Sequence, residues 1–292
     1  MKFMTIVNIS KPDFEIEPCE QILFVGSCFA DSIGRRFQEE QFQVVVNPYG
    51  VMYNPVSIWH TVKRLSIEKQ SLPFSTVVFT LGTNHVYIEK ATGEIVDNCQ
   101  KRPQKIFDER ELSIQECADY LMRSIDLLRR IQPSVRVILT VSPIRYAKYG
   151  YHESQLSKAR LLLAAEQVVN KGKRVEGQDL SNVKHFAHIV YFPAYEIVND
   201  ELRDYRFYKS DMLHPSEQAV EYIWERFIEI YFSSRAKQFL KDWRPIKEAL
   251  GHRPFQPESE GYREFINKTK QKISTLSEKY PTFAGNKVQI GM

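Results

Sequence analysis

Two pairs of residues, far apart in the sequence, have the chemistry needed for acyl transfer. Ser27 and Cys28 are adjacent nucleophiles that directly follow an apolar run, and Asp211 and His214 lie three residues apart near the end of the strand–helix pattern. A carboxylate that orients an imidazole, which then takes a proton from a hydroxyl or a thiol, activates a nucleophile. We therefore predict that Asp211 orients His214 and that His214 acts as general base and then as general acid.

Other polar positions could hold the oxyanion or the substrate. Gly50, in NPYGVMYNP, could offer a backbone N–H, and Asn84, in LGTNHVY, could offer its side-chain amide, beside the N–H of the nucleophile itself. Arg145, in VSPIRY, is a candidate for binding an anionic substrate group, and Asn98 could face the pocket. His85 is predicted to belong to a hairpin and not to act as a base.

Five short apolar runs would position these residues. Their continuous apolarity is typical of strands that are buried on both faces of a parallel sheet. The carboxyl ends of parallel strands share one edge, so the loops that follow them would meet there. The runs are residues 21–26, 42–47, 76–82, 135–141 and 188–192.

Amphipathic stretches alternate with these strands and predict a three-layer α/β/α sandwich around a five-stranded, mainly parallel sheet. Ser113 and Glu116 form a capping-box pattern at the start of one such stretch. A β-hairpin is predicted at 86–98, on either side of an Ala-Thr-Gly turn. The predicted helices are residues 31–41, 113–131, 154–171 and 216–232.

The pattern changes after residue 233 to helical pieces interrupted by prolines. We predict a domain at 1–233 and a helical C-terminal extension at 234–292 that packs on it or covers part of its mouth. From Arg235 onward there are 12 Lys or Arg against 6 Asp or Glu, although the whole chain carries a net charge of only +4. A solvent-exposed helical face explains this excess, and binding of nucleic acid is the alternative that we do not favour.

Composition restricts the class of protein. The 292 residues are 43% hydrophobic, which suffices for a large core. The four cysteines form no C-x-x-C pattern, so neither a metal site nor a disulfide framework is predicted, and no cofactor. No apolar run approaches the roughly 20 residues that span a bilayer, and the N-terminal run is too short for a signal peptide. We expect a cytoplasmic protein without a membrane partner; the sequence does not indicate its oligomeric state.

The order of these motifs resembles that of the SGNH (GDSL-like) hydrolase superfamily over about residues 21–232. ILFVGSC is similar to the superfamily's strand–Gly-Asp-Ser block, LGTNH to its Gly-x-Asn-Asp block and DMLHP to its Asp-x-x-His block. GSCFADSIG, NPYGVMYNP and YRFYKSDMLHPS look like the GSCFA family, over almost the whole chain. The resemblance implies a flavodoxin-like SGNH fold and a hydrolase-like site, without a known substrate.

The resemblance leaves two candidates for the nucleophile. In an ungapped comparison the superfamily's serine falls on Cys28 and its aspartate on Ser27, and a shift of one residue would restore Ser27 as the nucleophile. Position favours Cys28, whose thiolate we expect the helix N-terminus and His214 to stabilise. A serine would favour ester hydrolysis, whereas a thiolate accepts acyl groups readily from thioesters.

Three functions remain open at this point. We favour an ester hydrolase that works through an acyl-enzyme intermediate on a small-molecule or carbohydrate ester, with carbohydrate O-acetyl groups as one candidate by analogy of fold. An acyltransferase with a cysteine nucleophile is the first alternative. A non-catalytic binding module on the same scaffold is the second.

Overall fold

The computed structural model describes residues 3–68, 73–99, 102–175, 188–253, 255, 256, 258–283 and 288. Its centre is a five-stranded sheet in which every neighbouring pair is parallel. The first strand lies between the second and the third, which is the flavodoxin-like order. This confirms the predicted sheet. In spatial order its strands are β2 (Gln43–Val46), β1 (Gln21–Gly26), β3 (Thr76–Leu81), β7 (Arg136–Val141) and β8 (Ile189–Tyr191).

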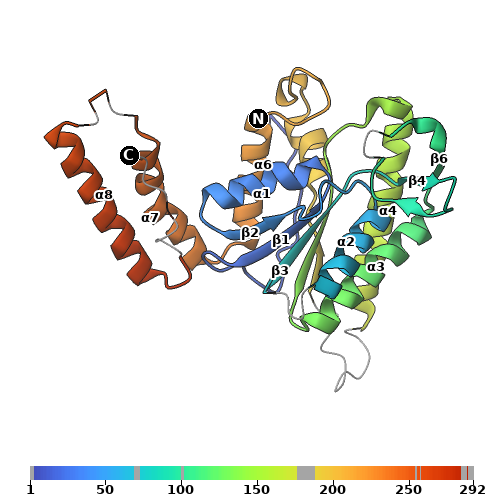
Figure 1. Cartoon of the computed structure of the whole chain (residues 1–292), viewed down its shortest axis with the longest axis horizontal. Coiled ribbons are helices and arrows are strands. Elements are labelled where there is room, and N and C mark those ends of the chain that lie inside the picture. The colour runs from blue at the N-terminus through green and yellow to red at the C-terminus, as the bar shows by residue number, and fades with distance from the viewer. Residues whose placement is uncertain are drawn as a thin grey trace.

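Helices cover both faces of this sheet, which confirms the predicted three layers (Figure 1). Successive residues of β1 point to opposite faces: Ile22 and Phe24 join one buried cluster, and Leu23 and Val25 join the other. The first cluster is shared with α1 (Cys28–Glu39) and α6 (Glu217–Tyr231). The second is shared with α2 (Pro55–Glu68), α3 (Ile114–Ile131) and α4 (Tyr151–Val175).

Helix α2 is an element that the sequence analysis did not predict. It begins where the second Asn-Pro step of NPYGVMYNP ends. The side chain of Asn54 accepts hydrogen bonds from the Ser57 backbone N–H at 3.0 Å and from the Ser57 hydroxyl at 3.1 Å. Pro55 occupies the first helical position, where no N–H is needed. The Asn-Pro pair is therefore the start of a helix as well as the end of a turn.

The predicted hairpin is part of a small three-stranded antiparallel sheet. Strands β4 (His85–Glu89) and β5 (Ile95–Val96) form the hairpin, and β6 (Phe107–Glu111) pairs with the other side of β4. The sequence of β6 is FDERE, in which charged residues dominate, so it shows none of the apolar alternation by which strands are recognised.

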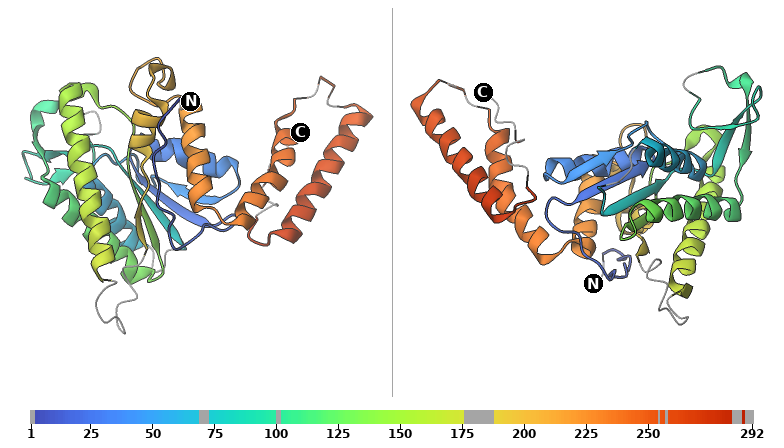
Figure 2. Two further views of the ribbon diagram at one scale, coloured as in Figure 1. Left: turned by 180° about the vertical axis from the view of Figure 1, so that it is seen from behind. Right: turned by 60° about the horizontal axis from the view of Figure 1, so that its bottom comes forward.

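The C-terminal part of the described chain forms α7 (Ser234–Gly251) and α8 (Glu260–Lys279), a pair that projects to one side of the sheet (Figure 2). Helix α7 is attached to the body: Phe239 and Trp243 lie in the cluster of α1 and α6, and the indole N–H of Trp243 donates to the Glu39 carbonyl at 3.1 Å. The domain boundary at residue 233 stays a prediction. Within the described residues, none of the helices has the length and apolar character that crossing a membrane requires.

Candidate active site

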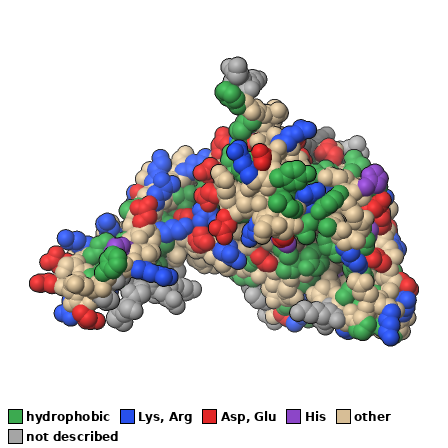
Figure 3. Space-filling view, turned by 90° about the horizontal axis from the view of Figure 1, so that it is seen from above, with side chains coloured by type: hydrophobic (Ala, Val, Ile, Leu, Met, Phe, Trp, Pro, Cys, Tyr) green, Lys and Arg blue, Asp and Glu red, His purple; other side chains and the backbone are tan. Residues whose placement is uncertain are grey.

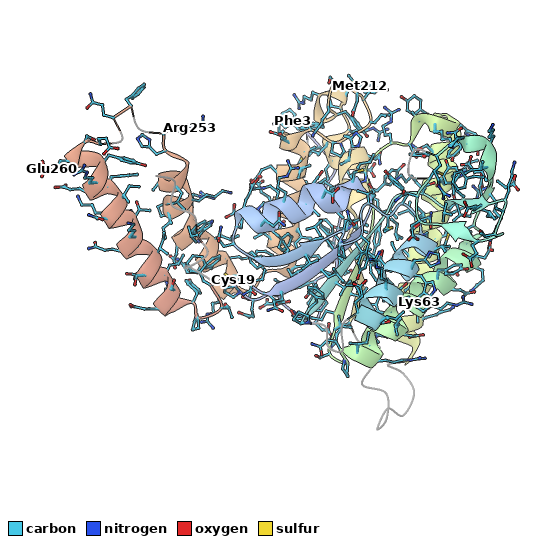
Figure 4. The ribbon with its side chains drawn as sticks, viewed as in Figure 1. Phe3, Cys19, Lys63, Met212, Arg253 and Glu260 are labelled. Atoms are coloured by element: carbon cyan, nitrogen blue, oxygen red, sulfur yellow. The ribbon has the colours of Figure 1, made fainter. Side chains whose placement is uncertain are left out.

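A pocket of about 300 Å³ lies at the carboxyl edge of the central sheet. Cys28 at the start of α1 and His214 in the loop before α6 both line this pocket. The structure therefore brings the predicted nucleophile and its predicted general base to the same pocket. Met212, two residues before the histidine, lies at the top of the view in Figure 4. The face that carries this edge mixes hydrophobic, basic and acidic side chains (Figure 3).

The turn between β1 and α1 is fixed by contacts that only glycine permits. Gly26 has φ +146°, and a Cβ there would lie 2.1 Å from the Thr80 carbonyl oxygen. Asn47 reinforces the turn: its Oδ1 accepts from the Gly26 N–H at 2.9 Å and its Nδ2 donates to Asp31 at 2.7 Å. The position of the next two residues, Ser27 and Cys28, is thereby set.

Ser27 and Cys28 have different environments within this turn. Ser27 is only 3% exposed, and its hydroxyl caps α1 by accepting from the Phe29 N–H at 3.3 Å while bonding the Thr80 hydroxyl at 3.2 Å. Cys28 is half-buried, lines the pocket and begins the helix, where its backbone N–H contacts its own thiol. Both residues line the pocket, but the serine hydroxyl is engaged as the cap of α1, and Cys28 as the nucleophile stays a prediction.

The electrostatic surroundings of Cys28 differ from what we expected. Burial raises the pKa of its thiol above the ordinary value, and the carboxylate of Asp31 raises it further, against a hydrogen bond with Tyr53 that lowers it. The expected stabilisation of a thiolate by the helix N-terminus is therefore outweighed. Because the thiol is protonated at neutral pH, its use as a nucleophile requires a general base.

Asp211 and His214 form the pair that their spacing predicted. Oδ2 of Asp211 lies 2.7 Å from Nδ1 of the imidazole. Oδ1 accepts from the backbone N–H of His214 at 3.0 Å and of Leu213 at 2.8 Å, and with the imidazole contact these bonds lower the pKa of Asp211 to about 2. The carboxylate therefore stays ionised, holds the ring and leaves Nε2 to exchange a proton.

Arg145 lines the pocket and also supports the histidine loop. Its backbone N–H donates to the Leu213 carbonyl at 3.0 Å, and its Nη1 donates to the Met212 carbonyl at 3.1 Å. Met212 has φ +56°, which is uncommon for a residue with a side chain, so the loop needs such external support. The residue that we predicted to bind substrate thus also positions His214.

Three other predicted site residues lie outside the pocket. The Gly50 N–H donates to the Asn47 carbonyl at 2.8 Å within its own turn. Asn84 is fully buried, and its Nδ2 donates to the Leu112 carbonyl at 2.7 Å. Neither they nor Asn98 are among the residues that line the pocket. In this structure each of these groups is bonded elsewhere, and the role of Gly50 and Asn84 as oxyanion donors stays a prediction.

His85 lies in β4, as the hairpin prediction required. It is 7% exposed and stacks on the ring of Tyr149, with the ring centroids 4.0 Å apart. Burial lowers the pKa of its imidazole, against the raising effect of Glu111 and Glu109. The ring is a packed part of the small sheet.

Two functional candidates were missed by the sequence analysis. The phenol of Tyr53 hydrogen-bonds the thiol of Cys28. The ammonium of Lys158 is buried behind the pocket and donates to the carbonyls of Gly82 at 2.7 Å and Ser142 at 2.8 Å. The sequence contains a signal for the lysine, because Lys158 lies three residues before Leu161 and therefore on the apolar, buried face of α4, where a charged side chain is unexpected.

Comparison with known proteins identifies a family whose models match this chain. A model described as "GSCFA family" matches residues 21–74 and 67–227, and one described as "GSCFA domain protein, C-terminal domain" matches residues 243–289. No protein of curated function matches the sequence.

Several solved structures are similar to this chain at low sequence identity. A putative GDSL-like lipase from Parabacteroides merdae is 12% identical, with 75% of this chain and 100% of that chain covered and a TM-score of 0.46. A carbohydrate esterase family 3 protein from Talaromyces cellulolyticus is 11% identical, with 76% of this chain and 99% of that chain covered and a TM-score of 0.40. An aryl esterase from M. smegmatis is 12% identical, with 72% of this chain and 97% of that chain covered and a TM-score of 0.42.

Proposed function

We propose that this chain, which belongs to the GSCFA family, hydrolyses esters through an acyl-enzyme intermediate on Cys28. One observation carries the proposal: the half-buried thiol and an imidazole held by a carboxylate at 2.7 Å line the same pocket. Nucleophile, base and orienting acid are the three parts that acyl transfer needs.

In the first half of the reaction, Nε2 of His214 takes the thiol proton and Sγ of Cys28 attacks the carbonyl carbon of the ester. The resulting oxyanion needs donors. The candidates are the backbone N–H of Cys28 at the start of α1 and the hydroxyl of Tyr53. As the acyl–oxygen bond breaks, His214 returns the proton to the leaving alcohol, and the acyl group remains as a thioester.

The second half reverses these roles. His214 takes a proton from water, the hydroxyl attacks the thioester carbon, and the acid leaves as Cys28 recovers its proton. An acyltransferase would use the same intermediate with another alcohol or thiol in place of water. Ile144, Ala147 and Leu213 form apolar parts of the pocket wall, and its volume of about 300 Å³, at the lower end of the range for small-molecule sites, favours a small ester.

The test is hydrolysis of 4-nitrophenyl acetate, with acid-quenched samples examined by intact-protein and peptide mass. Wild type should carry an acetyl group on Cys28. Cys28→Ala should lose both the adduct and turnover, and His214→Ala should slow acylation by about 10²-fold or more. Ser27→Ala should retain the adduct and lose about 1 kcal/mol of stability with its helix cap.

Two outcomes would contradict the proposal. Acetylation of Ser27, or undiminished turnover by Cys28→Ala, would exclude the cysteine as the nucleophile. A wild type that hydrolyses no ester and gains no adduct would favour the binding module. Cys28→Ser is the matched control, because it keeps the size and position of the nucleophile while removing the thiol.

A further inference from the structure

A second cavity, of about 490 Å³, lies next to the catalytic pocket, and Arg145 lines both. Its walls come from the first turns of α4, from the π-helix at Ile197–Leu202 and from the chain before the histidine loop. π-helical segments are rare and occur frequently at functional sites. A substrate whose ester carbonyl lies at Cys28 could therefore extend past Arg145 into this space.

The charge of Arg145 is not compensated by an acid. Within the described residues its guanidinium makes no ion pair; it lies over the Tyr151 ring at 4.0 Å and the Tyr208 ring at 5.5 Å, and Nη1 donates to the Met212 carbonyl. In contrast, the half-buried guanidinium groups of Arg36 and Arg226 each pair with glutamates. The guanidinium of Arg145 thus lies over two tyrosine rings, with N–H groups left for a ligand.

The two acids that line the second cavity have basic partners of their own. Asp200 lies 3.8 Å from Arg203, and Asp204 caps the following turn through the Arg206 N–H at 2.8 Å, with the Arg206 guanidinium at 4.0 Å. Their charges are offset locally. The remaining uncompensated charge at the junction of the two cavities is the cation of Arg145.

The other walls suit a polar ligand with a flat or hydroxylated body. Tyr195, Tyr205 and Tyr208 supply rings, and Gln155 and Asn199 supply amides. Tyr195 and Gln155 hydrogen-bond each other, and Nδ2 of Asn199 donates to the Tyr195 carbonyl at 2.8 Å, so this wall is organised in advance. Preorganisation reduces the entropy lost on binding.

We propose that the second cavity binds the leaving-group side of the ester and that Arg145 recognises an anionic group there, a carboxylate or a phosphate. This inference rests on the proposed function, since it names the substrate class of the same reaction. The planar guanidinium matches both anions, because each accepts two parallel N–H bonds.

The test compares three acetate esters of similar shape: 4-acetoxybenzoate, its methyl ester and 4-acetoxyphenyl phosphate. After correction for the non-enzymatic rate of each, wild type should show a kcat/KM at least about 10-fold higher for an anionic ester than for the methyl ester, chiefly through KM. The anion with the larger preference identifies the group. Added salt should reduce the preference, because it screens the charge.

Variants at Arg145 separate recognition of the anion from support of the loop. Arg145→Gln should abolish the preference, whereas Arg145→Lys should keep part of it, as a cation without the fork. Damage to the histidine loop lowers all three rates equally and leaves their ratio unchanged, so the ratio is the diagnostic quantity. Arg123→Gln removes a remote arginine that also lies over a tyrosine, at 5.2 Å, and should leave the ratio as in wild type.

The outcomes distinguish this inference from the proposed function. If the methyl ester acetylates Cys28 but wild type shows no preference for either anion, the anionic subsite is wrong and the hydrolase stands. An Arg145→Gln ratio equal to that of wild type would overturn the subsite equally. If no ester acetylates Cys28, the proposed function itself fails.

Discussion

Ser27 and Cys28, adjacent at the turn between β1 and α1, differ because the backbone gives their side chains different surroundings. Ser27 also lines the pocket, but its hydroxyl bonds the Thr80 hydroxyl and caps α1. Cys28 lines the pocket, but burial and the charge of Asp31 raise the pKa of its thiol. Under the proposed function, reactivity would then depend on proton removal by His214 and not on a thiolate that exists beforehand.

This dependence gives a pH prediction for Asp211→Asn. The amide can still accept the backbone bonds of the loop, but its NH₂ group facing Nδ1 favours the imidazole tautomer that cannot take the thiol proton. We expect kcat to fall by about 10⁴-fold at pH 7. Since the variant then depends on spontaneous ionisation of Cys28, whose pKa lies above its ordinary value of 9.0, its rate should keep rising through pH 9.

The control for this prediction is wild type over the same range. The pKa of Asp211 is about 2, so its carboxylate is ionised throughout and produces no change in rate above about pH 4. A variant whose pH profile has the shape of the wild-type profile, at any absolute rate, would show that Asp211 does not set the tautomer of His214.

The site residues that sequence predicts best are those fixed by local geometry. Asp211 and His214 are three residues apart, and the backbone bonds between them form within that short segment. The orientation of the Asn84 amide is less predictable, because it depends on the carbonyl of Leu112, 28 residues later, which no local pattern reveals. The choice between Ser27 and Cys28 likewise depends on Thr80, on a neighbouring strand.

At the scale of elements, the pocket depends on how β3 and β7 are joined at their carboxyl ends. Lys158 of α4 donates to the carbonyl of Gly82, just after β3, and to that of Ser142, just after β7. Both of these residues line the pocket. The Gly82 N–H in turn donates to the Tyr53 carbonyl at 3.0 Å, so the buried ammonium also helps to place the residue whose phenol bonds Cys28.

The burial of Lys158 predicts an unusual dependence of stability on pH. Burial lowers the pKa of its ammonium from 10.5 to about 7. Between these values the unfolded chain holds a proton that the folded protein has released, so the free energy of unfolding should rise with pH, by at most about 1.4 kcal/mol per pH unit. Below pH 7 both states are protonated and this contribution is constant.

Lys158→Met tests this by urea unfolding between pH 6 and pH 10. The variant should be destabilised at every pH, because two buried carbonyls lose their donor at about 1–3 kcal/mol each. The difference between wild type and the variant should grow from pH 7 to pH 10. Lys63→Met, at an exposed position of α2, should show no such growth. A constant difference for Lys158→Met would show that the ammonium does not titrate in this range.

Element prediction succeeded where burial produces a pattern and failed where it does not. The three inner strands β1, β3 and β7 are buried along nearly their whole length and are mainly apolar, and the half-buried edge strands β2 and β8 are also mainly apolar; all five were predicted. Strand β6 has three exposed charged residues in succession, Asp108 to Arg110, and carries no such pattern. Helix α2 follows a loop motif whose prolines indicated only a turn.

At the scale of the whole molecule, the question is whether the C-terminal extension folds with the body. Trp243 of α7 is 2% exposed and lies in the same buried cluster as Phe37 and Trp224 of α1 and α6. Lys247 adds an ion pair to Glu40 at 2.6 Å. These contacts bind α7 to the layer of helices that packs on the sheet beside Cys28.

Trp243→Ala should therefore destabilise the entire protein, by about 3–5 kcal/mol for a large aromatic side chain removed from a core. Unfolding followed by circular dichroism and by the alkylation of Cys28 should shift together, because α1 carries the thiol and lies against α7. Phe255→Ala removes a fully exposed aromatic ring and should change stability by less than about 0.5 kcal/mol. If Trp243→Ala instead shifts a separate unfolding transition and leaves the alkylation of Cys28 unchanged, residues 234–292 unfold as an independent domain. The core that they share with the body would then not couple the unfolding of the two parts.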